Sequence, residues 1–150
     1  MTPLILAIDP GKVTGVASWE PNRPTNLLAW EVPGRYDVAH FVDTMRPSEI
    51  VCEQFIISER TIRTAQDVNA LRIIGWLDIW CNQNAVPFDL QTAAQAKRFA
   101  TDEKLRALDW DTRTEGGHAN DAARHLMVYL HRKHTDFFRT YLLPTLMENL

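Results

Sequence analysis

Four side chains suited to metal-dependent chemistry stand at informative positions in the sequence. Asp9 directly follows the apolar run 4–8, and Glu53 follows the apolar run 50–52 in the same way. Short apolar runs that stop at polar or turn-forming residues indicate buried strands. Because ligands of open α/β sheets bind beyond the carboxyl ends of the strands, we expect the two carboxylates to converge at one sheet edge.

The other two candidates are His118 and Asp121, which open a predicted helix over 118–134. Residues three apart share a helix face, so both side chains can point the same way. Carboxylate oxygens are the ligands that Mg²⁺ prefers, and two ions about 3.5–4 Å apart can activate water and stabilise a leaving 3′-oxygen. The histidine can act as a ligand or a proton shuttle, and imidazole makes Mn²⁺ more acceptable. The set of four indicates metal-dependent phosphoryl transfer.

Each of the four residues, taken alone, has an ordinary structural explanation. Asp9 precedes Pro10 and Gly11 and can be a turn former, and Glu53 can be a simple strand-end carboxylate. Asp121 suits the dipole of a helix N-terminus, and His118 can be a solvated residue at the helix start. Only their combination and order point to a site.

The elements that must position these residues are predicted from apolar runs and periodicity. Strands are expected at 4–8, 13–19, 27–32, 50–52 and 86–90, and helices at 37–45, 61–83, 92–98, 118–134 and 137–150. The polar stretch 102–117 stays unassigned. The first three strands are joined by short loops, which favours an antiparallel meander, and the later alternation of helices and strands favours parallel pairing. The fold class is therefore α/β with a mixed sheet.

Composition limits the functional classes further. The 150 residues are 45% hydrophobic and 23% charged, which predicts one globular domain over 1–150 and excludes disordered or fibrous chains. No apolar run approaches the ~18 residues of a membrane span, and the start lacks a basic signal-peptide region. Cys52 and Cys81 form no CxxC motif, so we expect reduced thiols and a cytoplasmic location. The net charge of −3 neither supports nor excludes nucleic-acid binding.

Four segments together resemble the motifs of RuvC-type Holliday-junction resolvases. Residues 6–16 (LAIDPGKVTGV) resemble the first-strand motif, and residues 50–55 (IVCEQF) resemble the second, an apolar strand ending in Glu-Gln. Residues 118–123 (HANDAA) resemble the third, and residues 91–97 (QTAAQAK) resemble the segment that leads into a basic, DNA-facing helix. The resemblance covers about residues 4–134, and the motifs occur in the family's order.

This resemblance implies an RNase H-like fold with a five-stranded mixed sheet flanked by helices. It implies a homodimeric endonuclease that resolves four-way DNA junctions by paired nicks, with two Mg²⁺ ions per site or Mn²⁺ in their place, and leaves 5′-phosphate ends. Asp9, Glu53 and Asp121 take the metal-ligand positions, and His118 takes a position that is Asp in some members and His in others. Compact phage-type relatives are closer than the longer bacterial enzymes, which implies a bacterial cell or phage-infected host. The 99–117 stretch departs from the family pattern, so junction selectivity stays open.

Candidate DNA contacts lie near the motifs. Basic side chains can neutralise phosphates without reading sequence, and an aromatic residue just past Glu53 can wedge into opened base steps. The candidates are Lys12, Phe55, Arg60, Arg63, Lys97, Arg98 and Lys104. The alternatives are that the basic residues line solvated helix faces and that Phe55 packs in the core.

The predicted 62–83 helix is apolar on nearly all sides between residues 73 and 81. Such a helix must be covered on nearly all sides, so we expect a homodimer through it. The alternative is burial under the C-terminal helix with its residues Leu142, Leu143 and Leu146.

Three other functions remain open. The first is an actin-like or sugar-kinase nucleotide-binding domain, whose first strand also ends in Asp-x-Gly, although such proteins need two domains of this kind. The second is a broader RNase H-like nuclease that acts on RNA, nicked DNA, flaps or forks. The third is a non-catalytic DNA-binding module.

Overall fold

A five-stranded mixed sheet forms the centre of the molecule. The computed structural model describes residues 3–24, 26–59, 68–112 and 116–150. The strands are β1 (Ile5–Asp9), β2 (Val13–Trp19), β3 (Leu27–Pro33), β4 (Glu49–Glu53) and β5 (Phe88–Gln91), in the order β3-β2-β1-β4-β5. The strands β1, β2 and β3 pair antiparallel, whereas β4 pairs parallel with both β1 and β5. The predicted α/β class, with a five-stranded mixed sheet flanked by helices, is confirmed.

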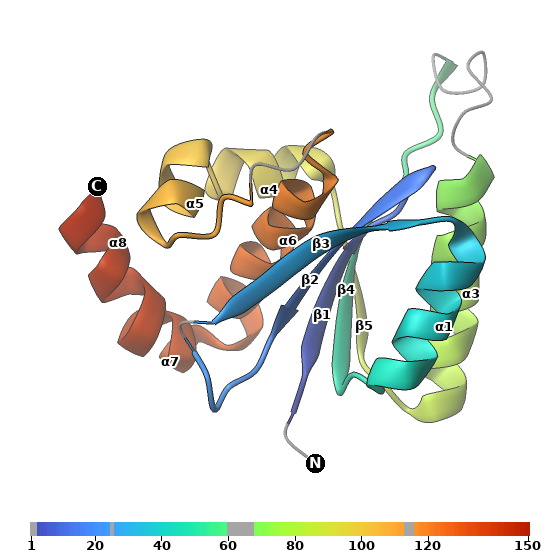
Figure 1. Ribbon diagram of the computed structural model, residues 1–150, viewed down its shortest axis with the longest axis horizontal. Helices are drawn as coiled ribbons and strands as arrows, with labels where there is room; N and C mark the ends of the chain where they lie inside the picture. Colours follow the sequence, from blue (N-terminus) through green and yellow to red (C-terminus); the bar gives the residue numbers. More distant parts are fainter. Residues whose placement is uncertain (1–2, 25, 60–67, 113–115) are drawn as a thin grey trace.

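Helices cover both faces of this sheet (Figure 1). One face carries α1 (Arg35–Met45) and α3 (Val68–Asn84). The other carries α4 (Ala93–Phe99), α5 (Asp102–Ala107), α6 (His118–Lys133), α7 (Thr135–Phe137), a π-helical turn η1 (Phe138–Leu142) and α8 (Leu143–Asn149). Two separate hydrophobic clusters fill the space between the sheet and these two helical layers.

The alternation of side chains along the central strands explains the two clusters. Successive residues of a strand point to opposite faces, so Ile5 and Ala7 pack toward α6 while Leu6 and Ile8 pack toward α3. Both faces of β1 are buried, which is why its sequence is apolar without alternation.

The structure assigns the stretch that the sequence left open and divides the last predicted helix. Thr101 caps α5 by accepting a hydrogen bond from the Lys104 backbone N–H, which starts a helix inside the polar 102–117 segment. The C-terminal helix is interrupted by η1, where the Leu143 N–H bonds to the Phe138 carbonyl. Pro144 follows immediately and has no N–H to continue a regular α-helical ladder, so the turn before it widens.

The alternative explanation for the apolar 62–83 helix, burial under the C-terminal helix, is wrong. Leu142 and Leu146 pack in the cluster on the α6 side, whereas Ile73 and Leu77 of α3 pack on the opposite face of the sheet. The sheet and α1 cover one side of α3, and the apolar residues Val68, Leu71 and Ile79 of this helix stay exposed among the described residues. Residues 61–67, where the predicted helix begins, lie outside the described residues.

Gly15 allows α6 to cross directly over the sheet. A Cβ atom at Gly15 would lie 1.8 Å from the carbonyl oxygen of His118 and 2.9 Å from the amide nitrogen of Ala119. Both neighbours are backbone atoms of the first turn of α6, so only glycine permits this approach. The position of Gly15 in β2 therefore sets how close the start of α6 lies to the end of β1.

Both cysteines are free, in agreement with the expected reduced thiols, and both are buried. Within the described residues, no helix is long and apolar enough to cross a membrane.

Candidate active site

Asp9 and Glu53 lie side by side at the carboxyl edge of the sheet. The register pairs Ile8 of β1 with Cys52 of β4, and the two acidic residues directly follow this pair. Asp9 is in phase with Ile5 and Ala7, so its side chain lies on the face that α6 covers. The predicted convergence of these two carboxylates at one edge is present in the fold.

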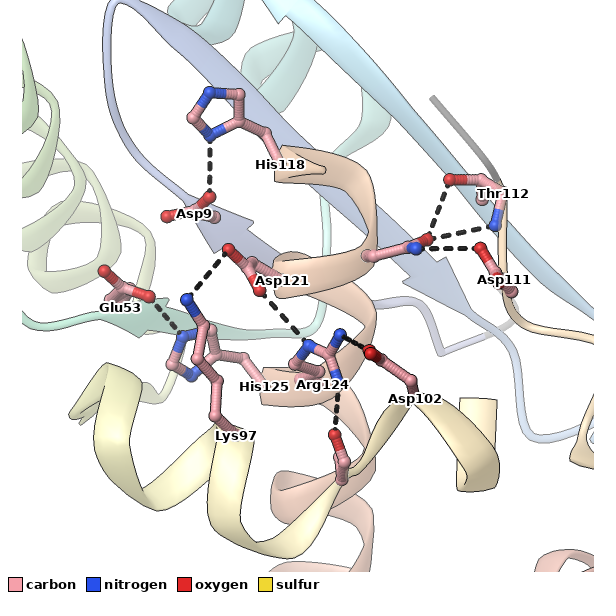
Figure 2. A network of polar contacts seen from close by, with 12 residues as sticks. Asp9, Glu53, Lys97, Asp102, Asp111, Thr112, His118, Asp121, Arg124 and His125 are labelled. Carbon is pink, nitrogen blue, oxygen red and sulfur yellow. Dashed lines mark hydrogen bonds and ion pairs between the residues drawn. The ribbon is translucent and has the colours of Figure 1, made fainter. Parts of the chain in front are cut away.

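The first turn of α6 brings His118 to the same edge. Its N-cap residue, Gly117, has no side chain to bond the first amide groups, and the carboxylate of Glu31 on β3 accepts a hydrogen bond from the His118 N–H at 3.2 Å instead. The Nδ1 atom of His118 lies 3.0 Å from Oδ2 of Asp9. Figure 2 shows this pair above the end of β1, with Asp121 three residues further along the first turn of the helix.

The four predicted catalytic residues face one open cleft of about 710 Å³. Its lining comprises Asp9, Pro10, Gly11, Lys12, Val13, Glu53, Phe55, Asn69, His118 and Asp121. These residues come from the ends of β1 and β4, the turn between β1 and β2, and the starts of α3 and α6. The cleft thus collects residues from sequence positions 9 to 121 into one solvent-accessible space.

The environment of Asp9 favours its protonated form. Burial raises the pKa of Asp9 to about 6, and the neighbouring carboxylates of Glu53 and Asp121 contribute to this rise. The hydrogen bond with His118 acts in the opposite direction. A carboxyl group whose pKa is raised by burial and by other carboxylates in a cleft is typical of a functional site.

Asp121 is held by two basic side chains. Its Oδ1 accepts from Nε of Arg124 at 3.2 Å, and its Oδ2 lies 3.6 Å from Nζ of Lys97. Arg124 also donates to the carbonyl of Ala100 and to the carboxylate of Asp102, which ties α6 to the junction between α4 and α5 (Figure 2). The position of Asp121 therefore depends on the neighbouring helices as well as on α6.

A further residue, His125, lies behind the cleft and contacts Glu53, and the sequence did not identify it. Its Nε2 lies 2.8 Å from Oε2 of Glu53, and its Nδ1 lies 3.1 Å from Oε1 of Gln91. A signal was present, because His118, Asp121 and His125 are spaced three and four apart and so form one stripe on a helix. The spacing alone does not distinguish such a residue from a core histidine.

The donor set fits a divalent metal ion in its chemistry. Hard carboxylate oxygens from Asp9, Glu53 and Asp121 line the cleft together with an imidazole, and their mutual repulsion contributes to the raised pKa of Asp9. The same oxygens are bonded to protein partners, and no group of three or more His, Cys, Asp or Glu among the described residues is gathered closely enough to hold an ion as it stands. Metal binding would therefore compete with partners such as Lys97.

The predicted DNA contacts differ in their surroundings. Lys12 is exposed and Phe55 half-buried, both along the cleft, so Phe55 is not a core residue. Lys97 and Arg98 are exposed on α4, with Lys97 beside Asp121. Lys104 is half-buried, and its ammonium donates to the Phe99 carbonyl at 2.7 Å and lies over the Phe99 ring. Two further candidates, Arg60 and Arg63, lie outside the described residues.

Comparisons with known proteins identify the fold. No protein-family model matches the chain, and no curated protein is significantly similar to it. A structure of Thermus thermophilus RuvC in complex with Holliday junction substrate has a TM-score of 0.62 at 13% identity, covering 91% of this chain and 94% of that chain. A second Thermus thermophilus RuvC structure has a TM-score of 0.59 at 15% identity, covering 88% and 97%. The chain thus has the RuvC-like fold that its motifs indicated.

Proposed function

We propose that this protein is a divalent-metal-dependent endonuclease that cleaves branched DNA, with the four-way junction as its main substrate. The observation that carries the proposal is that Asp9, Glu53, His118 and Asp121 line one open cleft at the carboxyl edge of a RuvC-like sheet. The solved structure that shares this fold contains RuvC with a Holliday junction substrate, which supports the choice of substrate.

The carboxylates of Asp9, Glu53 and Asp121 would hold two Mg²⁺ ions, or Mn²⁺ in their place, with His118 as a further ligand or proton shuttle. Ions bound there would activate a water molecule for in-line attack on a phosphodiester and stabilise the leaving 3′-oxygen, which yields a 5′-phosphate end. The protein's own contribution is to hold the three carboxylates at the end of β1, the end of β4 and the first turn of α6. Their repulsion within the cleft favours binding of cations.

Side chains around the cleft supply the proposed DNA surface. Lys97 and Arg98 project from α4 on one side, and Lys12 lies in the turn between β1 and β2. These residues would neutralise phosphates beside the cleft and so fix the position of the strand without reading its sequence. Phe55 lines the cleft just beyond Glu53, where an aromatic ring can wedge into opened base steps at a branch.

A homodimer is the proposed assembly. The apolar side chains of Val68, Leu71 and Ile79 are exposed on α3 at fractions of 47%, 42% and 58%. Their spacing places them on one stripe of the helix, away from the buried residues Ile73 and Leu77. A two-fold related copy packed on this stripe would bury it and provide a second cleft for the second strand of a junction.

Cleavage of end-labelled DNA by the purified protein tests the proposal. The substrates are a four-way junction, a flap and a linear duplex of the same sequence, each with Mg²⁺, Mn²⁺ or EDTA. We expect paired, symmetric nicks in the junction, dependent on the metal and absent with EDTA.

The other outcomes distinguish the alternatives. Equal cutting of flaps and junctions would support a broader structure-selective nuclease with the same site. Binding of the junction without cleavage under either metal would support a non-catalytic DNA-binding module, and neither binding nor cleavage would contradict the proposal.

A further inference from the structure

We propose that His125 is a positioning residue that fixes the carboxylate of Glu53 for metal binding. The inference rests on the proposed function, because it assigns Glu53 to the metal site. His125 does not line the cleft. It contacts Glu53 from behind, and its proposed effect on the site passes through this contact (Figure 2).

The first observation is the burial of His125 between two polar partners. The residue is 0% exposed, yet both ring nitrogens lie within hydrogen-bond distance of another side chain, Glu53 on one side and Gln91 on the other. A buried imidazole without partners would be costly, and an apolar residue would suit this depth better. The two contacts therefore account for a histidine at this point of α6.

The chemistry of the three groups fixes the direction of the hydrogen bonds. An ionised carboxylate only accepts, so the Nε2–H of His125 donates to Glu53. In a neutral imidazole Nδ1 is then an acceptor and requires a donor from Gln91. A half-turn of the Gln91 amide, whose two ends have nearly the same shape, supplies that donor and gives Gln91 Nε2, which otherwise has no hydrogen-bond partner among the described residues, the acceptor Nδ1 of His125. The resulting chain runs from Gln91 through His125 to Glu53.

The backbone holds both ends of this chain. Glu53 of β4 and Gln91 of β5 are directly paired in the parallel register. The Gln54 N–H also donates to the Gln91 carbonyl at 2.7 Å, which continues the pairing past the end of β4. His125 adds α6 as a third rigid element, four residues after Asp121. Glu53 is thereby tied to α6, the helix that also carries the proposed ligands His118 and Asp121.

A second polar cluster provides a matched control. At the opposite end of β4, the carboxylate of Glu49 accepts from the Tyr129 hydroxyl at 2.6 Å and lies 2.9 Å from Nε2 of His134. Tyr129 lies four residues after His125 on α6, and its partner belongs to the same strand. Removing the Tyr129 hydroxyl breaks a similar link between α6 and β4 without touching the cleft.

The experiment measures Mn²⁺ binding to the full chain without DNA, by calorimetry and by the electron paramagnetic resonance of free Mn²⁺. The variants are His125→Gln, His125→Asn and His125→Leu, with Tyr129→Phe as control. The amide nitrogen of glutamine reaches the place of Nε2 and can still donate to Glu53, whereas that of asparagine reaches only the place of Nδ1. We expect His125→Leu and His125→Asn to weaken Mn²⁺ binding about 10–100-fold. The Mn²⁺ affinities of His125→Gln and Tyr129→Phe should remain close to that of the wild type.

The outcomes separate this inference from the proposed function. If the wild type binds no Mn²⁺, the proposed function itself fails. If the wild type binds and His125→Asn binds as tightly as His125→Gln, the positioning role is overturned. The comparison of these two polar variants holds even if His125→Leu does not fold, and circular dichroism of each variant confirms that the fold is intact.

Discussion

The Nδ1 atom of His118 lies 3.0 Å from the carboxylate of Asp9, although 109 residues separate them along the chain. The contact joins the end of β1 to the first turn of α6, where the Glu31 carboxylate also bonds the His118 amide. The fold therefore brings the first and last motifs of the sequence into direct contact. Asp9 is the most buried of the proposed metal ligands, and changes at this residue are the most informative.

Asp9→Asn is expected to bind a four-way junction about as well as the wild type and to fail to cut it. Asparagine keeps the size of the side chain but removes the charge that would hold a cation. Substitution of residues that only support metal ligands typically reduces metal affinity or activity about 10–100-fold. Because Asp9 is itself a proposed ligand, its substitution should reduce the cleavage rate more than ~100-fold. Gel-shift and cleavage assays with Mg²⁺ measure the two effects. Asp136→Asn changes an exposed residue of α7, so it serves as the control and should cleave normally. Full cleavage by Asp9→Asn would show that Asp9 is not a catalytic residue.

The raised pKa of Asp9 predicts how stability depends on pH. The pKa rises from an ordinary 3.8 to about 6, so between these values the folded protein holds a proton that the unfolded chain has released. The free energy of unfolding should therefore fall as the pH rises through this window and stay lower above it. This rise in the pKa corresponds to roughly 3 kcal/mol of unfolding free energy.

Urea unfolding of wild type and Asp9→Asn at pH 4 and pH 7, without divalent metal, measures this effect. From pH 4 to pH 7 the free energy of unfolding of the wild type should fall by up to about 3 kcal/mol more than that of the variant. Parallel pH profiles of the two proteins would show that Asp9 does not carry the effect.

The sequence predicted the sheet well because its strands are short apolar runs that end in informative residues. β1 and β4 are buried on both faces, so their apolar runs are continuous, and their last residues are the acidic ones. The antiparallel pairing of the first three strands and the parallel pairing of the later ones followed from the loop lengths and the helix–strand alternation. The convergence of Asp9 and Glu53 followed in turn, because parallel neighbours end at the same edge.

Long-range side-chain partners could not be predicted in this way. The contact between His125 and Gln91 requires the exact depth of α6 over β5, which no local pattern encodes. The π-helical turn near Pro144 and the cap on α5 depend on single residues inside otherwise ordinary helical or polar stretches. The bonding of Lys104 to Phe99 likewise shows that a basic residue near a motif can serve the packing of its own helix.

Gly15→Ala is expected to destabilise the protein by about 1–3 kcal/mol or more, because the new methyl group would collide with the backbone of α6. The collision would also displace His118 from Asp9 and reduce cleavage. Gly75→Ala is a matched control, since a Cβ there meets nothing within 4 Å and Gly75 lies inside α3. The free energy of unfolding of Gly75→Ala, measured with urea, should rise by about 0.5–1 kcal/mol. Equal effects of the two substitutions would contradict the close approach at Gly15.

Lys97→Ala is expected to have opposite effects on DNA and on metal. Loss of a phosphate contact should weaken junction binding and reduce the slope of log K against log salt by about one. Loss of the ion pair with Asp121 should at the same time leave that carboxylate freer and strengthen Mn²⁺ binding in the absence of DNA. Lys133→Ala, at the far end of α6, is the control and should change neither quantity. An unchanged salt slope in Lys97→Ala would exclude Lys97 as a phosphate contact.

Ile79→Glu is expected to convert a dimer into a monomer. Ile79 is 58% exposed on α3, in line with Val68 and Leu71. In a two-fold interface the new carboxylate would be buried without a partner and would face the same carboxylate of the second copy, so both desolvation and repulsion oppose the dimer. Sedimentation velocity or light scattering measures the change in mass. Met147→Glu is the control, because Met147 is also exposed but lies on α8, on the other side of the sheet.

The cleavage pattern of the Ile79→Glu monomer then tests why a dimer is needed. Each cleft is built from one chain in the described structure, so the monomer should still nick a junction with Mg²⁺. It should lose the paired, symmetric second nick, because the second cleft is no longer held against the opposite strand. A wild type that is monomeric at all concentrations, or a variant that still makes paired nicks, would exclude the α3 stripe as the interface.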